Sequence, residues 1–308
     1  MTEPTSIIFA CDESGAKGYA DQDEQYPDEV GAFAGFLVPE DYLAGKLPLF
    51  HALISKYSSS DGKLHIADLS PEQQEALRQD VYQAIQNSGL PCFWYAIHVA
   101  GFHSWHQVEQ RLLKDARAAT AGSTVKRGSA RPDPSSLHAA LFNGIYGHLI
   151  AFLEEHGETN VDMEVRSDQI DPPIIKVFEE EAHRLLSTDP NIALGTGFDT
   201  ATKTVIHGQV SSQIHYPPEL EIKTAVRNLT FNPIQAGDGL VLAADVLANS
   251  LYDLFKTRPD NERFSSLNTP AAVAAHPLAK NLDAFSNWGE GDLLGDRLYR
   301  HPKAPSLE

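Results

Sequence analysis

Apolar residues cluster in short blocks along the first hundred residues, and these blocks predict strands. The segments SIIFACD (6–12), GAFAGFLV (31–38) and CFWYAIHVA (92–100) are apolar at both odd and even positions. A strand with this pattern is covered on both faces, so we expect the first two segments to form a hairpin at the centre of a sheet. The third segment is expected to add another strand. The acid-rich loop between the first two segments is expected to be solvated.

Helical signals follow these strands. Residues 70–89 begin with Ser70 as N-cap and Pro71 at the first helical position, and Gly89 marks the end. Two further helices are expected over 104–119 and 135–156, on either side of a basic loop rich in Gly, Ser and Pro. In the second half, helices are expected over 172–186, which begins with two prolines, and over 238–255, which gives the strongest signal there.

Two later segments predict further strands. Residues 160–168 alternate apolar and polar side chains, the period of a strand with one wetter face. Residues 203–216 suggest another strand, with a bulge at Gly208. Strands mixed with helices in this order indicate an α/β fold with helices packed on a mixed central sheet. We expect one domain over 1–256, with inserted helices and a basic loop at about 101–135, followed by a loosely ordered cap over 257–308.

Composition says more about where the protein is located in the cell than about its activity. The chain has 308 residues, of which 42% are hydrophobic, and its N-terminus MTEPTS lacks the basic region of a signal peptide. No apolar run approaches the roughly 20 residues that span a bilayer, so we expect a cytoplasmic protein with no membrane partner. The two cysteines, Cys11 and Cys92, have no disulfide or zinc spacing and are expected to be reduced thiols of the core.

The charge balance argues against a general affinity for nucleic acid. The chain carries 42 acidic residues against 24 Lys and Arg, a formal net charge of -18. Nucleic-acid binding would therefore have to rest on a local basic patch. The segment 111–131 offers one, with Arg111, Lys114, Arg117, Lys126, Arg127 and Arg131. Its simpler interpretation is a solvated helix face that continues into a loop.

Three isolated acids need an explanation. Asp245 lies in the apolar run LVLAADVLA, where an unpaired carboxylate would be costly to bury. Asp12 and Asp168 each close a predicted strand, although each could instead be a turn or capping residue, just as Asp238 is most simply an N-cap. Taken together, two strand acids and one helix acid are what a centre of two divalent ions about 3.5–4 Å apart needs.

Four segments resemble one protein family in order and spacing. These are FACDESGAKG (9–18), KLHIADLS (63–70), VRSDQID (165–171) and LAADVLANS (242–250). They are similar to segments of the domain of unknown function 3800 family, whose members look like ribonuclease H-fold proteins. The resemblance covers roughly residues 7–255, and its most specific parts are DESG and ADxLA.

This resemblance implies a ribonuclease H-like domain with a catalytic centre that cleaves phosphodiesters. Asp12, Asp168 and Asp245 would be ligands of Mg²⁺ or Mn²⁺. Glu13, also a catalytic candidate, would be a secondary ligand or a structural neighbour, because adjacent strand residues point to opposite faces and both could reach one metal only if the strand twists or ends there. His65 would orient water or bind a phosphate oxygen, although a single histidine is more often structural.

The chain also departs from the family pattern. Lys63 stands where family members often carry a Glu, and Leu242 stands where they often carry a Gln. Loss of an acid could reduce the site to one metal ion, whereas Lys63 could contact phosphate. The substrate-binding candidates are therefore Lys63, Lys126, Arg127 and Arg131.

Three functions follow from these observations. The first is a metal-dependent nuclease or phosphodiesterase acting on RNA or DNA. The alternative is a non-catalytic ribonuclease H-like module that binds protein or nucleic acid. A hydrolase that acts through Ser14 and a histidine is the third, and it is weaker because DESG is not the GxSxG elbow of such enzymes.

Overall fold

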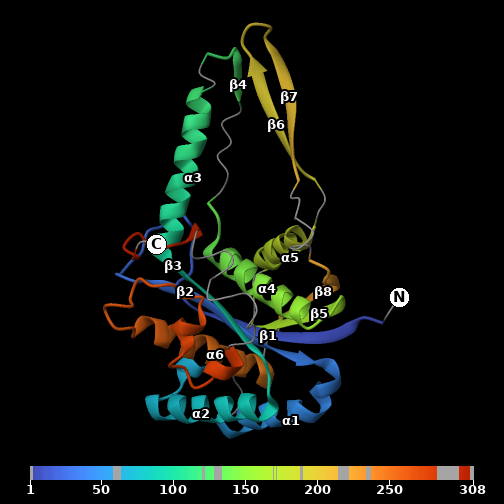
Figure 1. The fold of residues 1–308 in the computed structure, drawn as a ribbon, viewed down its shortest axis with the longest axis vertical. Helices are drawn as coiled ribbons and strands as arrows, with labels where there is room; N and C mark the ends of the chain where they lie inside the picture. Colours follow the sequence, from blue (N-terminus) through green and yellow to red (C-terminus); the bar gives the residue numbers. More distant parts are fainter. Residues whose placement is uncertain are drawn as a thin grey trace.

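The computed structural model describes residues 3–57, 64–119, 122–127, 134–168, 170, 172–187, 190–213, 222–233, 237–282 and 298–305. A body made of one five-stranded sheet and its covering helices carries a projection that contains a second, smaller sheet (Figure 1). The strands are β1 (Thr5–Gly15), β2 (Val30–Pro39), β3 (Cys92–His98), β4 (Val125–Arg127), β5 (Asn160–Ser167), β6 (Asn191–Asp199), β7 (Thr204–Ser212) and β8 (Ala225–Pro233). The helices are α1 (Glu40–Tyr57), η1 (Ile66–Asp68), α2 (Pro71–Ser88), α3 (Val99–Ala119), α4 (Leu137–Glu155), α5 (Pro172–Leu186), α6 (Gly239–Lys256), η3 (Pro270–Val273) and α7 (Ala279–Leu282).

The central sheet has the strand order β3-β2-β1-β5-β8. β1 pairs antiparallel with β2, which pairs antiparallel with β3, so the predicted hairpin and its third strand are confirmed. On the other side β1 runs parallel to β5, and β5 runs parallel to β8. The sheet is therefore mixed, and β1 is its middle strand.

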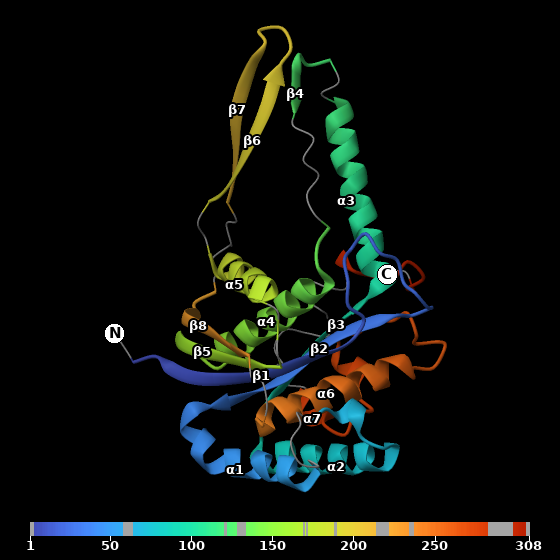
Figure 2. The same cartoon turned by 180° about the vertical axis from the view of Figure 1, so that it is seen from behind.

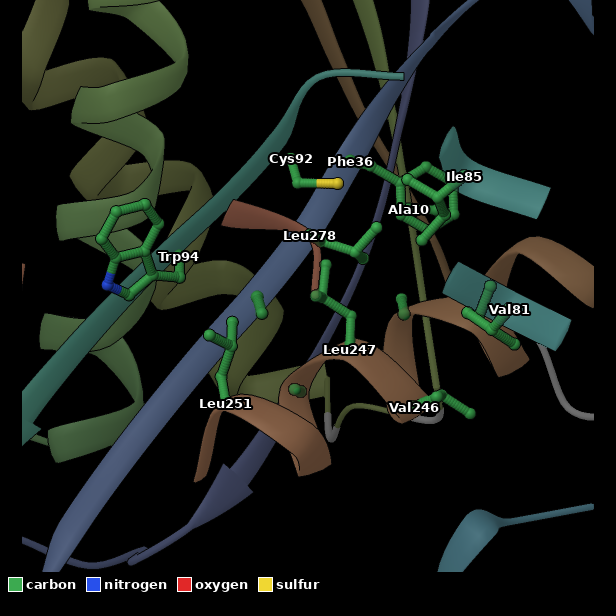
Figure 3. Packing of buried hydrophobic residues seen from close by; sticks show 14 of the residues in the cluster. Ala10, Phe36, Val81, Ile85, Cys92, Trp94, Val246, Leu247, Leu251 and Leu278 are labelled. Carbon is green, nitrogen blue, oxygen red and sulfur yellow. The ribbon is translucent and has the colours of Figure 1, made fainter. Parts of the chain in front are cut away.

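Helices cover both faces of this sheet, as expected for the α/β class. Even-numbered residues of β1, such as Ile8 and Ala10, pack with α1, α2 and α6 in one buried cluster. Odd-numbered residues, such as Ile7 and Phe9, pack with α4 and α5 in a second cluster. Figure 3 shows part of the first cluster, where Leu247 and Leu251 of α6 lie beneath the sheet. Because side chains of a strand alternate between faces, each residue of β1 is assigned to one layer.

Capping signals located two helices accurately. Ser70 caps α2 in a full capping box with Gln73, and Gly89 ends the helix in the left-handed conformation that favours glycine. Asp238 caps α6, where its side chain accepts a hydrogen bond from the Leu240 amide at 2.8 Å. α3 begins at Val99, directly after β3, which is earlier than the sequence pattern suggested.

The strand predicted over 203–216 differs from the one observed. β7 spans Thr204–Ser212 and pairs with β6 in an unbroken register in which Gly208 stands opposite Gly195, so the predicted bulge at Gly208 is wrong. β7 belongs to the smaller sheet, of order β4-β6-β7. The fifth strand of the central sheet is instead β8, whose mixed burial pattern gives little periodic signal.

The described part of the C-terminal region packs onto the body. Leu267, Val273 and Leu278 are buried in the same cluster as α6, and Asn268 exchanges two hydrogen bonds with the backbone of Ala96. Residues 257–282 thus share the core of the residues before them. No helix among the described residues is long and apolar enough to cross a membrane.

Candidate active site

Two of the predicted acids lie at the same edge of the central sheet. β1 and β5 are parallel, and Ala10 lies beside Arg166, so Asp12 and Asp168, each two residues further along the chain, lie toward the same edge of the sheet. The predicted end of the strand at Asp12 is wrong, because β1 stays paired with β2 as far as Gly15. Asp12 has the same parity as Ala10 and therefore belongs to the face covered by α6. Its side chain is 6% exposed, and its Oδ1 accepts a hydrogen bond of 2.8 Å from the Glu13 amide.

His65 joins this edge to α6. Its Nε2 lies 3.5 Å from Oδ2 of Asp168, and its Nδ1 lies 3.7 Å from Oδ2 of Asp245. The amide of Ile66, the first residue of η1, donates a hydrogen bond of 3.0 Å to the same Asp245 oxygen. The helix acid and the His-containing segment are thereby fixed to each other, so the predicted His65, Asp168 and Asp245 lie in one place.

The charge of Asp245 acts on Asp12. Burial, together with the nearby carboxylates of Glu13 and Asp245, raises the pKa of Asp12 well above its ordinary value. Like charges that are held close in a poorly hydrated position repel each other. A bound cation would relieve this repulsion.

Glu13 lies on the other face of β1. Its Oε1 accepts a hydrogen bond of 2.7 Å from the Lys17 ammonium, and its Oε2 lies 3.5 Å from Nε2 of His138 on α4. Although burial opposes ionisation, the neighbouring His138 and the ammonium of Lys17 together outweigh it and lower the pKa of Glu13. The side chain of Glu13 is therefore directed to α4, away from Asp245. Neither His138 nor Lys17 was predicted, because a single His or Lys carries no spacing signal.

The basic candidates are not beside the acids. Lys126, which is exposed, and Arg127 lie on β4, in the smaller sheet that projects from the body (Figures 1 and 2). Lys63 and Arg131 lie outside the described residues. The structure thus brings together Asp12, His65, Asp168 and Asp245 and places Lys126 and Arg127 elsewhere.

The donor set suits a hard divalent cation in its chemistry. Among the described residues, no three His, Cys, Asp or Glu side chains are already grouped as one metal ion requires. The side chains that do converge are three carboxylates and one imidazole, and carboxylate oxygens are the ligands preferred by Mg²⁺ and Mn²⁺. Asp12, which is buried and repelled by the charge of Asp245, is the feature that such an ion would stabilise.

Comparison of the sequence with protein-family models gave no match. A search among curated proteins gave no match either.

Proposed function

We propose that this chain is a metal-dependent phosphodiester hydrolase, a nuclease acting on RNA or DNA, built on a ribonuclease H-like fold. The observation that carries the proposal is the convergence of Asp12, His65, Asp168 and Asp245, which come from four separate segments of the chain. The mixed central sheet with helices on both faces supports the fold part of the proposal.

In this proposal the chain's own residues have distinct tasks. Asp12, Asp168 and Asp245 hold Mg²⁺ or Mn²⁺, which when bound activates a water and stabilises the leaving oxygen of a phosphodiester. The Ile66 amide keeps Asp245 in position through its hydrogen bond. The imidazole of His65, which contacts two of the carboxylates and is about one-third exposed, is placed to orient water or a phosphate oxygen.

Glu13 takes the role of a structural neighbour in this proposal. Its carboxylate is engaged by Lys17 and His138 on the far face of β1, and its charge contributes to the raised pKa of the adjacent Asp12. Lys126 and Arg127 of β4 are proposed to contact the nucleic-acid backbone beyond the scissile bond, because the rest of the chain is strongly acidic.

The proposal is tested by Mn²⁺-supported cleavage of labelled single-stranded and duplex RNA and DNA. Wild type is compared with Asp12→Asn and Asp245→Asn, and Asp260→Asn serves as the control because Asp260 is 89% exposed and pairs only with Arg263 in the ion pairs described. We expect cleavage by wild type and by the control and loss of cleavage in the other two variants. Equal activity in all four proteins would overturn the proposal.

A second candidate is a non-catalytic interaction module on the same fold. The large apolar side chains exposed on β6 and β7 favour it, since such surfaces often mark interaction sites. Mn²⁺ titration separates the two candidates, because the module needs no metal. Cleavage that requires Asp12 would exclude it.

A further inference from the structure

A projection extends from one end of the body and carries most of the exposed apolar side chains. It consists of α3, β4, β6 and β7, and we call it the arm (Figures 1 and 2). Among the described residues, eight of the twelve exposed large hydrophobic side chains lie on the arm: Val108, Leu112, Leu113, Ile192, Leu194, Phe198, Val205 and Ile206. The arm therefore has a surface that differs from the rest of the molecule.

The ribbon formed by β6 and β7 has no core behind it. Neither buried cluster of the described residues contains a residue of these two strands. Ile192, Leu194 and Phe198 alternate along β6 and so share one face, and Val205 stands opposite Phe198 on the same face. Leu194 is 82% exposed. This apolar face makes no contribution to the fold of the body.

β7 is an edge strand without the usual protection. In the order β4-β6-β7, one side of β7 pairs with β6 and the other side has no partner strand among the described residues. Edge strands of monomeric proteins usually carry Lys, Pro or a bulge that prevents pairing with another chain. The sequence of β7, TVIHGQVSS, contains no Lys, Arg, Asp, Glu or Pro, and its register with β6 is unbroken.

The sequence of β7 is also partly symmetric about Gly208, with similar residues at 206 and 210 and at 204 and 212. An antiparallel pair of two β7 strands centred on Gly208 would match Ile206 with Val210, Val205 with Ser211 and Thr204 with Ser212. His207 would stand opposite Gln209, and no like charges would meet. A Cβ placed on Gly208 would contact nothing within 4 Å, so the centre of the strand is open. We propose that β7 pairs antiparallel with β7 of a second copy of this chain, forming a two-fold symmetric dimer through the arm.

A second copy fits this edge better than the other occupants do. Nucleic acid is held by Lys and Arg, and neither β6 nor β7 contains one. A contact between the same strand in two copies is self-complementary, as a two-fold interface must be. Because each chain has a formal net charge of -18, contact through β7, which has no Lys, Arg, Asp or Glu, also keeps two acidic bodies apart. This inference is independent of the proposed nuclease activity.

The first test measures the mass of the full chain by light scattering after gel filtration. We expect twice the 33.7 kDa of one chain for wild type, and a monomer for Ile206→Lys, which places a charge opposite the apolar Val210 of the second copy and gives the edge strand the Lys that usually prevents pairing. Leu49→Lys is the control, since Leu49 is similarly exposed but lies on α1. Mixing Ile206→Lys with Val210→Glu is expected to restore a dimer, because residue 206 of one copy stands opposite residue 210 of the other, and a misfolded variant would not do this.

The second test fixes the register by oxidative crosslinking. Both native cysteines are buried, so an introduced cysteine is the only accessible thiol. Gly208→Cys is expected to form an intermolecular disulfide readily, because residues directly opposite in antiparallel strands have Cα atoms about 4.5–5.5 Å apart. Thr204→Cys is expected not to, because its two copies would be separated by eight residues, about 27 Å at 3.4 Å per residue.

Three results would overturn the proposal. These are a wild-type chain that stays monomeric at tens of micromolar, a dimer that survives Ile206→Lys, and crosslinking of Thr204→Cys as rapid as that of Gly208→Cys. A wild-type chain that is monomeric and uses β7 to bind labelled RNA or DNA, or a strand of a different protein, would also overturn the proposal.

Discussion

Asp12 and Glu13 are adjacent in the sequence, yet they face different layers of the protein. Asp12 lies on the side of α6 and is affected by the charge of Asp245, whereas Glu13 binds Lys17 and lies beside His138 on the side of α4. The alternation of strand side chains accounts for this separation. Two acids that look like one motif in the sequence therefore lie in two different environments.

This difference predicts unequal effects of two conservative substitutions. Asp12→Asn is expected to lower Mn²⁺-dependent cleavage by at least about 100-fold, because it removes a charge that would hold the metal. Glu13→Gln is expected to keep activity within about tenfold, since Glu13 supports Asp12 only indirectly. Steady-state cleavage assays on the two variants measure the ratio. Losses of equal size would contradict the assignment of Glu13 as a structural neighbour.

The candidate site was predictable at the residues that stand out against their surroundings. Asp245 was recognisable because it interrupts an apolar helix, and Asp12 and Asp168 because each follows the apolar residues of a strand, although β1 itself continues to Gly15. The partners of Glu13 were not predictable, because the contact of β1 with His138 of α4 depends on packing between segments more than a hundred residues apart.

At the scale of elements, the crossing of α1 and α6 depends on a close backbone approach. A Cβ on Gly239, the first residue of α6, would lie 2.3 Å from the carbonyl of Phe50 in α1. Backbone atoms in a helix cannot move aside as a flexible side chain can. The contact with α1 in turn helps to hold α6 against β1, so that Asp245 of α6 reaches the site.

Gly239→Ala is therefore expected to destabilise the protein by about 1–3 kcal/mol, the usual cost of overpacking. Gly45→Ala in α1 is the matched control, because a Cβ there would contact nothing within 4 Å. In a helix interior this control is expected to be neutral or to stabilise by about 0.5–1 kcal/mol. Urea unfolding midpoints of the two variants and wild type provide the comparison, and equal midpoints for both variants would contradict it.

Elements with strong local signals were predicted from the sequence, and elements that depend on distant contacts were not. α2 and α6 have caps and periodicity, and β1, β2 and β3 are continuous apolar runs. α1 was not predicted, since it contains Pro48 and no capping signal. β4, β6 and β8 were missed because their described residues are largely exposed, which removes the apolar pattern that marks a strand.

At the scale of the whole molecule, two buried histidines tie the C-terminal region to the body. His98, at the end of β3, lies edge-on to the ring of His301, and His276 shares a hydrogen bond of 2.9 Å with Ser250 of α6. Burial lowers the pKa of both His98 and His276 to about 4. Both are therefore neutral in the folded protein at neutral pH.

Acidification is expected to weaken the fold through these two residues. Between about pH 6.5 and about pH 4 the unfolded chain binds protons at His98 and His276 while the folded chain does not, so stability falls as the pH falls. The decrease in the free energy of unfolding has an upper limit of about 3 kcal/mol for each histidine. Urea midpoints at pH 7 and pH 5 measure it.

The matched comparison is the double variant His98→Gln and His276→Gln. Carboxylates and the overall charge contribute to the pH dependence in both proteins, so the difference between them isolates the two histidines. A smaller pH dependence in the double variant is expected. The same dependence in both proteins would show that neither histidine is held neutral by burial.

The most direct test of the central claim is a calorimetric titration of the full chain with Mn²⁺. If Asp12, Asp168 and Asp245 form a divalent metal centre, wild type and the exposed control Asp260→Asn bind Mn²⁺ alike, and Asp12→Asn and Asp245→Asn bind it at least about tenfold more weakly. Circular dichroism of each variant verifies that it is folded. Absence of Mn²⁺ binding by wild type at millimolar concentrations, or equal affinities in all four proteins, would contradict the account.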